Sequence, residues 1–100
     1  MSISITVNDV KDIATITIVG SFDFSLFNEF RAGYSDLNKP YKTYVVDMSM
    51  VEYLDSAALG MLLSMRNAIE ADCNIQLTGA NAFIKNILMI SRFDKRFDIQ

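Results

Sequence analysis

The sequence predicts an α/β fold, in which a mixed sheet of about five strands begins with an antiparallel pair and is covered by about three helices. Three observations support this prediction. Two runs rich in β-branched residues, 3–10 and 13–19, are separated by a short polar connection, which favours an antiparallel hairpin. From residue 25 onward, helical and extended patterns alternate, and such alternation calls for parallel strands joined by right-handed crossovers. Hydrophobic residues make up 51% and charged residues 21% of the chain, as in compact domains.

The two runs of the predicted hairpin differ in exposure. Residues 3–10 alternate loosely between apolar and polar side chains, as expected of an edge strand with one exposed face. Residues 13–19 are denser in β-branched side chains and form the clearest strand of the sequence. Gly20 is expected to end this strand, and residues 21–24 are expected to form a loop.

Three helical patterns follow, each introduced by a residue that can cap a helix. Ser25 precedes the first pattern, which is expected to end near Pro40 because proline cannot continue a helix. The second helix is predicted over residues 56–72, and Asn81 is expected to cap a third that ends near Ile90. The apolar stripe of the first contains Phe27, Phe30, Tyr34 and Leu37, and that of the third contains Phe83, Ile84, Ile87 and Leu88.

Short apolar runs separate these helices and predict the remaining strands. They cover residues 43–47, which end in Asp47, then 74–79 and 97–99. The connection over residues 48–53 is expected to be a loop, although it is unusually apolar. Ligands of such sheets gather beyond the carboxyl ends of the parallel strands, so we expect the loops 20–25 and 48–56 to meet there.

Ser56 stands at the predicted start of the second helix and has two interpretations. Its hydroxyl can be an N-cap that accepts a hydrogen bond from one of the first backbone N–H groups. Alternatively, it can be a phosphorylation site, because the positive end of the helix dipole can also receive a phosphate. Histidine is absent from the sequence, which excludes histidine-based nucleophilic sites and argues against a hydrolase nucleophile.

The spacing of residues in the second helix predicts one apolar face and one face of small, uncharged residues. The apolar arc contains Leu59, Leu62, Met65, Ile69 and Cys73. The opposite arc contains Ser56, Ala57, Gly60, Ser64, Asn67 and Ala71. Because a purely solvated face is expected to carry Lys and Glu, this flat surface favours contact with another protein. A neutral face exposed to solvent is the alternative.

Four carboxylates, those of Asp23, Asp47, Glu52 and Asp55, are expected to converge near Ser56. Such a cluster can bind Mg²⁺, but carboxylates alone are a weak signal for a metal, and solvated loop ends are the more frequent explanation. We therefore predict no metal, no cofactor and no catalytic residue. An enzyme would have to be a hydrolase that uses carboxylates and a metal.

Charge and length narrow the classes of partner. The chain of 100 residues fits a single domain, residues 1–100. Nine basic and twelve acidic residues give a net charge of −3, which argues against nucleic-acid binding and attraction to anionic membranes. The first residues lack the pattern of a targeting segment, and no apolar run reaches the length of a bilayer span. These features predict a cytoplasmic protein, without membrane insertion, that binds other proteins.

Several of these segments resemble the STAS family, in particular its single-domain anti-anti-sigma factors (anti-sigma factor antagonists). The resemblance covers nearly the whole chain and is clearest in the paired first strands, the strand ending in Asp47, Gly20-Ser21-Phe22-Asp23 and Tyr53-Leu54-Asp55-Ser56-Ala57-Ala58-Leu59-Gly60. The serine of the Asp-Ser pair is the phosphoacceptor in the family, and it falls on Ser56. The family often has glycine at the position of Ala58.

The resemblance implies a mechanism called partner switching. The unphosphorylated domain binds a serine kinase of the histidine-kinase-like ATPase fold, often an anti-sigma factor, and so frees the other target of that kinase. Phosphorylation of Ser56 breaks the complex, and a metal-dependent serine phosphatase restores it. The domain then acts in signal transduction and catalyses nothing. Asp23 and Asp55 are expected to shape the docking site, with Gly60, Ser64 and Asn67 as its floor beside Ala57.

The resemblance leaves the output of the domain open. The downstream target can be a sigma factor that controls transcription, a biofilm or secretion pathway, or a second-messenger enzyme. A constitutive subunit of a membrane lipid-transport or stress-sensing complex is the alternative function, because it can dock by the same helix without phosphorylation. Ser56 would then be only a helix cap.

Overall fold

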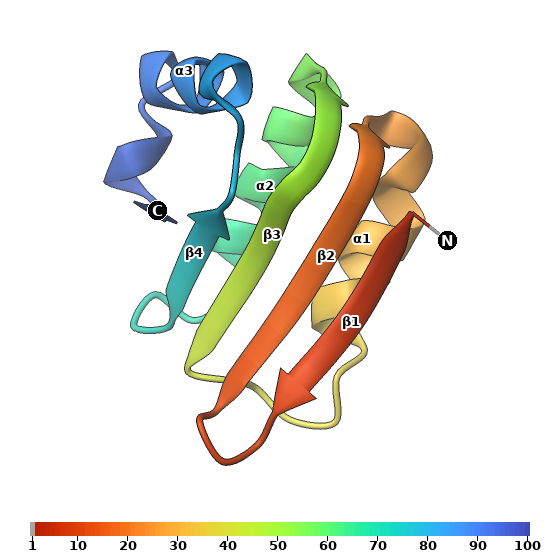
Figure 1. The fold of residues 1–100 in the computed structure, drawn as a ribbon. Helices are drawn as coiled ribbons and strands as arrows, with labels where there is room; N and C mark the ends of the chain where they lie inside the picture. The colour runs from red at the N-terminus through yellow and green to blue at the C-terminus, as the bar shows by residue number, and fades with distance from the viewer. Residues whose placement is uncertain (1) are drawn as a thin grey trace.

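The computed structural model describes residues 2–100, which form one five-stranded sheet and three α-helices (Figure 1). The strands are β1 (Ile3–Asn8), β2 (Ile13–Phe22), β3 (Thr43–Leu54), β4 (Asn74–Thr78) and β5 (Asp98–Ile99). The helices are α1 (Phe27–Ser35), α2 (Ser56–Ala68) and α3 (Ala82–Ile90), and short 3₁₀ turns cover Phe24–Leu26 and Phe93–Lys95. The predicted order of elements is confirmed.

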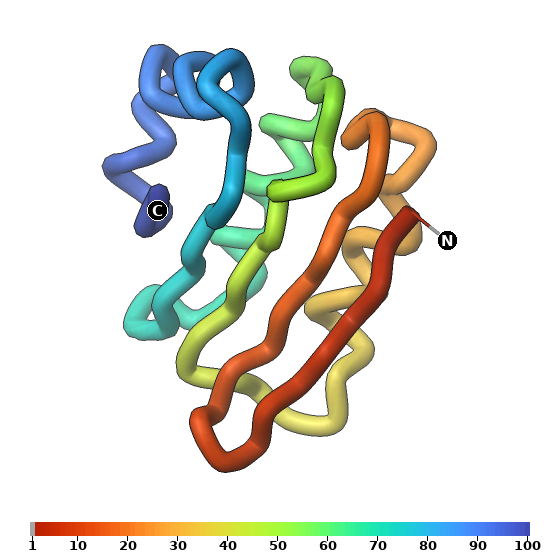
Figure 2. The backbone as a smooth tube through the Cα atoms, in the orientation of Figure 1, coloured from red at the N-terminus to blue at the C-terminus, as the bar shows by residue number. Residues whose placement is uncertain are grey.

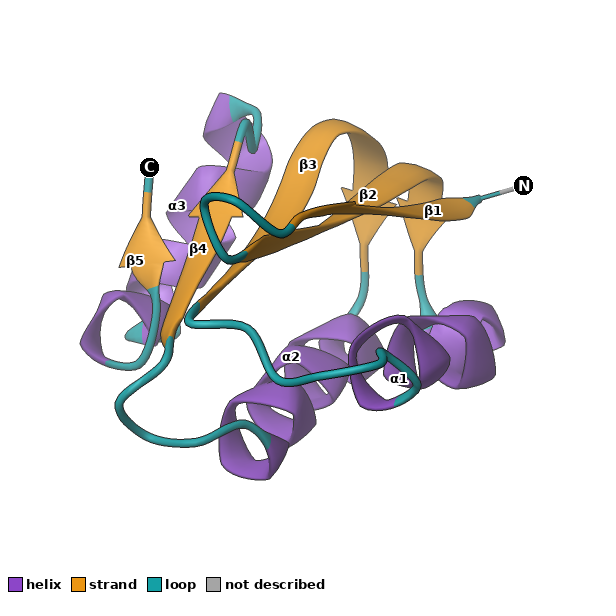
Figure 3. Cartoon of the chain, turned by 90° about the horizontal axis from the view of Figure 1, so that it is seen from below, coloured by secondary structure: helices purple, strands orange, loops and turns teal. Residues whose placement is uncertain are grey.

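The strands lie in the sheet in the order of the sequence, so β1 and β5 form its two edges (Figure 2). β1 pairs antiparallel with β2, and every other pair is parallel. The mixed sheet with an antiparallel first strand is therefore confirmed. Right-handed crossovers between parallel strands that follow one another in this order place their helices on the same side of a sheet. Figure 3 shows α1 and α2 together on one face of the sheet.

The hydrophobic core lies between this face and the helices. Alternate residues of β2 and β3 point into it because side chains of a strand alternate between faces. The largest fully buried side chains are Phe22, Phe30, Ile16, Ile18, Met48, Leu62, Met65, Ile75, Leu77, Ile84, Leu88 and Val46. Among residues 2–100 the buried side chains are those of apolar and aromatic residues, and the only buried hydroxyls of this core belong to Tyr41 and Tyr44.

Two strands are longer than the sequence predicts. β2 continues through Gly20 to Phe22, and β3 continues from Asp47 to Leu54. Gly20 has a φ of +88°, and the β2–β3 register shifts between Thr17 and Val19 and again between Gly20 and Ser21. Gly20 therefore bends the strand at a bulge and does not end it. The prediction of a loop at residues 48–53 is also wrong, because β3 continues through them and Met50, Val51 and Tyr53 pair with the far end of β2.

The first helix begins and ends differently from the prediction. Asp23, not Ser25, caps the 3₁₀ turn that leads into α1, because its carboxylate accepts the backbone N–H of Ser25 at 3.0 Å. The helix stops at Ser35, so Leu37 lies beyond it, although Leu37 still packs against the core. The other three predicted stripe residues behave as expected: Phe30 is buried, and Phe27 and Tyr34 pack against the core.

The structure also differs from the prediction in the second and third helices. α2 ends at Ala68 because Ile69 is already extended, with φ −95° and ψ 144°. Its buried face is Ala58, Met61, Leu62 and Met65, so Leu62 and Met65 are predicted correctly and the remaining predicted core positions lie at its margin or beyond. The expected cap of α3 is confirmed, since the Asn81 side chain accepts the N–H of Ile84 at 2.9 Å. Phe83 is 68% exposed and does not belong to the apolar stripe of the core.

Candidate functional site

The carboxyl ends of β2 and β3 pair with each other, as the order of the elements predicts. We call this paired end, residues 20–22 and 51–54, the ledge. Gly20 pairs with Val51, Ser21 with Tyr53 and Phe22 with Leu54. The backbone N–H of Asp55 then donates to the carbonyl oxygen of Phe22 at 3.4 Å. The segments 20–25 and 48–56 therefore meet as expected, but they meet as paired strands. Backbone pairing makes this ledge firmer than two loops would be.

Helix α2 starts directly from the ledge, and Asp55 is its N-cap. Asp55 has extended backbone angles of −109° and 177°, and its carboxylate accepts the N–H of Ala58 at 2.9 Å. The interpretation of Ser56 as the N-cap is wrong, because Ser56 is already the first helical residue. An N-cap must be extended to turn its side chain back onto the first helical turn, and only the residue before Ser56 meets that condition.

The Ser56 side chain is left free by this arrangement. Its residue is exposed, and its hydroxyl makes no hydrogen bond to any of residues 2–100. The backbone N–H groups of Ser56 and Ala57 also have no acceptor in the described part of the chain. Such groups at a helix start carry the positive end of the dipole. The hydroxyl of the exposed Ser56 therefore lies close to two backbone N–H groups that have no acceptor within residues 2–100.

The acidic residues near Ser56 do not gather into a cation site. Asp23 accepts the N–H of Ser25, Asp47 accepts the N–H of Ser49 at 3.0 Å, and Asp55 caps α2. Each of these three carboxylates binds a backbone N–H within three residues of itself. Over residues 2–100, no three acidic or cysteine side chains form a group able to hold a metal ion. The expected convergence of the four carboxylates into such a cluster is therefore wrong.

The predicted partner-binding residues of α2 lie along one stripe of the helix. Ser56, Gly60, Ser64 and Asn67 are exposed, and Ala57 is half-buried. A Cβ added at Gly60 would meet no atom within 4 Å, so the surface is open there. Asn67 is engaged within the chain, because its Oδ1 accepts a hydrogen bond from Arg96 Nη2 at 2.8 Å. The stripe is therefore exposed and uncharged at Ser56, Gly60 and Ser64, and Asn67 at its far end is bonded to Arg96.

Three exposed apolar side chains were missed by the sequence analysis. Phe24 is 65% exposed, Met50 57% and Tyr53 53%. They belong to the 3₁₀ turn before α1 and to the far end of β3, so they frame the ledge from which α2 starts. The unusual apolarity of residues 48–53 was the signal for two of them. Large exposed apolar side chains near an open helix face favour a protein-binding surface.

The chain belongs to the STAS family, whose model, described as Mlab, STAS domain, matches residues 5–99. A STAS-domain containing protein of Pseudomonas aeruginosa is 41% identical over 86 residues, which cover 85% of each chain.

Solved structures share the fold. One is an anti-sigma factor antagonist from Mycobacterium paratuberculosis, with a TM-score of 0.78, 20% identity and coverage of 98% of this chain and 85% of the other. Another is the anti-sigma factor antagonist SpoIIAA in its unphosphorylated form, with a TM-score of 0.75, 15% identity and coverage of 98% and 86%. The chain therefore has the architecture of anti-sigma factor antagonists. Across residues 2–100, no helix has the length and apolarity that crossing a bilayer requires.

Proposed function

We propose that this domain is a protein-binding regulator controlled by phosphorylation of Ser56. The observation that carries the proposal is the free, exposed hydroxyl at the first position of α2, with the capping role taken by Asp55. A cap hydroxyl would be turned towards the helix backbone. Here Ser56 is exposed, where a kinase can reach it, and its modification leaves the Asp55 cap in place.

A phosphate on Ser56 would change the charge of this surface and leave the fold intact. It would add about −1.5 to −2 charges at neutral pH. The free N–H groups of Ser56 and Ala57 and the helix dipole would favour this charge, so the domain tolerates it. The neighbouring Asp55 carboxylate would add to the negative potential. A partner that packs on the neutral stripe of α2 would then have to bury an unpaired charge, which costs several kcal/mol.

We propose that the unphosphorylated form binds an anti-sigma-type serine kinase of the histidine-kinase-like ATPase fold and that phosphorylation releases it. A metal-dependent serine phosphatase restores the binding form. The partner surface comprises Asp23, Asp55, Ala57, Gly60, Ser64 and Asn67, to which the structure adds the exposed Phe24, Met50 and Tyr53. The likeness to SpoIIAA supports this proposal, because that structure is described as the unphosphorylated form of an anti-sigma factor antagonist. The domain itself catalyses nothing.

The phosphorylation site is tested by mass spectrometry of the protein purified from its native cells and after incubation with its kinase and ATP. The kinase is obtained by affinity capture on the Ser56→Ala variant, which cannot be released by phosphorylation. Phosphate is expected on Ser56 alone. Ser91→Ala is the matched control, because Ser91 is an exposed serine at the end of α3, outside the proposed partner surface, and its loss should leave phosphorylation unchanged. Phosphate that persists in Ser56→Ala would refute the assignment.

The switch itself is tested by calorimetry with the purified kinase. Ser56→Ala is expected to bind it as the unmodified chain does, and Ser56→Asp is expected to bind at least about 100-fold more weakly, which corresponds to about 2.7 kcal/mol. Equal binding and equal function of the two variants would instead favour the constitutive subunit of a membrane lipid-transport or stress-sensing complex.

A further inference from the structure

Strand β1 is an edge strand without the features that usually protect an edge. Its six residues, Ile3–Asn8, include no charged side chain and no proline, and its pairing with β2 runs without a register shift. Proteins usually guard exposed edges with charges, prolines, bulges or very short strands, because unpaired backbone groups recruit another strand. The opposite edge, β5, shows such protection: it has only two residues, one of which is Asp98.

The hydrogen-bond pattern identifies the backbone groups that β1 presents at the edge. The N–H of Val19 donates to the carbonyl oxygen of Ser2 at 2.8 Å, so these two residues form a hydrogen-bonded pair. Such pairs recur at every second residue of an antiparallel ladder. Ser4, Thr6 and Asn8 therefore direct their backbone groups towards β2. The N–H and C=O groups of Ile3, Ile5 and Val7 point outward and have no acceptor or donor within residues 2–100.

The same three residues place apolar side chains on the helix side of the edge. Ile3 is buried, whereas Ile5 remains 38% and Val7 44% exposed. Ile5 faces α1, because a Cβ added at Gly33 would lie 2.8 Å from Ile5 Cδ1. The edge thus combines unpaired backbone groups with partly exposed apolar side chains, and both would become buried if a further strand were added.

We propose that β1 pairs antiparallel with β1 of a second copy of this chain, about a two-fold axis at Ile5. In this register Ile5 lies opposite Ile5 of the partner subunit, and Ile3 lies opposite Val7 of the partner subunit. Each residue that points outward then meets another that points outward, which allows about six new backbone hydrogen bonds, two for each pair. The partner is a second copy because this arrangement is self-complementary and brings no charged side chains of β1 together. It does not depend on the proposed function of Ser56.

Amide hydrogen exchange tests the pairing residue by residue. In dilute solution the amides of Ile3, Ile5 and Val7 should exchange rapidly, while those of Ser4, Thr6 and Asn8 are protected by the ladder. As the protein concentration rises into the millimolar range, the three outward amides should become protected together. Sedimentation velocity over the same range should show conversion of monomer to dimer. A chain that stays monomeric, or whose outward amides stay unprotected in the dimer, would overturn the proposal.

Two variants localise the contact. Val7→Pro removes an N–H that has no partner inside the monomer, so it should leave the sheet intact and raise the dissociation constant of the dimer at least about tenfold. Val7→Lys adds a charge at the same half-exposed position and should act in the same direction. Gln76→Lys is the control, because it adds an identical charge on β4, away from this edge. A dimer that persists unchanged in both folded Val7 variants would place the interface elsewhere.

Discussion

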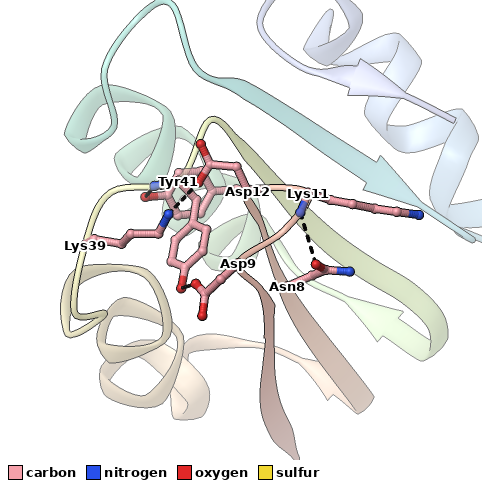
Figure 4. A network of polar contacts seen from close by, with 7 residues as sticks. Asn8, Asp9, Lys11, Asp12, Lys39 and Tyr41 are labelled. Carbon is pink, nitrogen blue, oxygen red and sulfur yellow. Dashed lines mark hydrogen bonds and ion pairs between the residues drawn. The ribbon is translucent and has the colours of Figure 1, made fainter.

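The two ends of the sheet use polar side chains in different ways. At the amino ends of β2 and β3, hydrogen bonds join segments that are far apart in the sequence (Figure 4). The hydroxyl of Tyr41 donates to Asp9 Oδ1 at 2.8 Å, and Lys39 Nζ lies 3.0 Å from Asp12 Oδ1. Lys39 also lies 4.7 Å from the ring centroid of Tyr41. These contacts tie the β1–β2 hairpin to the connection between α1 and β3.

At the carboxyl ends, the polar side chains bind only their own neighbours. Asp23, Asp47, Asp55 and Asn81 each accept a backbone N–H two or three residues further along the chain. Contacts of this kind shape turns and helix starts without linking one segment to another. Polar side chains therefore cross-link one end of the sheet, whereas the other end carries the surface for which we propose partner binding and phosphorylation.

The largest expected effect concerns Gly79, which holds the carboxyl end together by close backbone contact. Its φ is +74°, and an added Cβ would lie 2.8 Å from Ser49 Cβ and 2.9 Å from Ser49 N. Gly79→Ala should therefore lower the free energy of unfolding by about 2–4 kcal/mol, since it combines backbone strain with a clash. Urea denaturation measures this value.

Gly20→Ala separates the two contributions to the Gly79 effect. Gly20 has a similar φ of +88°, but an added Cβ would meet no atom within 4 Å. Its substitution should cost only the strain, about 1–2 kcal/mol. Equal losses of stability for Gly20→Ala and Gly79→Ala would show that the contact with Ser49 does not constrain the carboxyl end.

A smaller effect is expected for the cap of α2. Asp55→Ala removes the acceptor of the Ala58 N–H and should lower the free energy of unfolding by about 1 kcal/mol. Ser56→Ala is the matched control, and it should change stability by less than about 0.5 kcal/mol because Ser56 caps nothing. The reverse order in thermal or urea unfolding would restore Ser56 as the structural cap and weaken the case that its hydroxyl is free.

The choice of N-cap between Asp55 and Ser56 could not be predicted from the local sequence. Aspartate and serine are both strong N-cap residues, so the local pattern at Asp55 and Ser56 does not decide between them. The decision comes from the extension of β3 to Leu54, which keeps Asp55 extended as it leaves the sheet. That extension depends on pairing with β2 beyond the bulge at Gly20, a contact between distant segments that no local periodicity records.

Features governed by local patterns were predicted well. The density of β-branched residues over 13–19, the asparagine before α3 and the apolar positions Leu62 and Met65 identify a strand, a cap and a core face, and the structure confirms each. The order of elements and the parallel pairing follow from the alternation of helices and strands. The cross-links at the amino ends were not predicted, because Tyr41 and Asp9 are 32 residues apart and ordinary in composition.

The smallest expected effect tests that cross-linked end directly. The hydrogen bond to Asp9 raises the pKa of Tyr41 above its ordinary value of 10.0, and burial adds to the shift. Because the neutral hydroxyl is favoured in the folded state, its contribution to stability is complete below pH 10 and is lost as the pH rises through the raised pKa. Tyr41→Phe should therefore lower stability near neutral pH by less than Asp55→Ala does, and should weaken the alkaline decline in stability.

Tyr53→Phe is the control, since Tyr53 is an exposed tyrosine at the other end of the sheet. Identical alkaline unfolding curves for the two variants would show that the bond between Tyr41 and Asp9 does not distinguish the two ends.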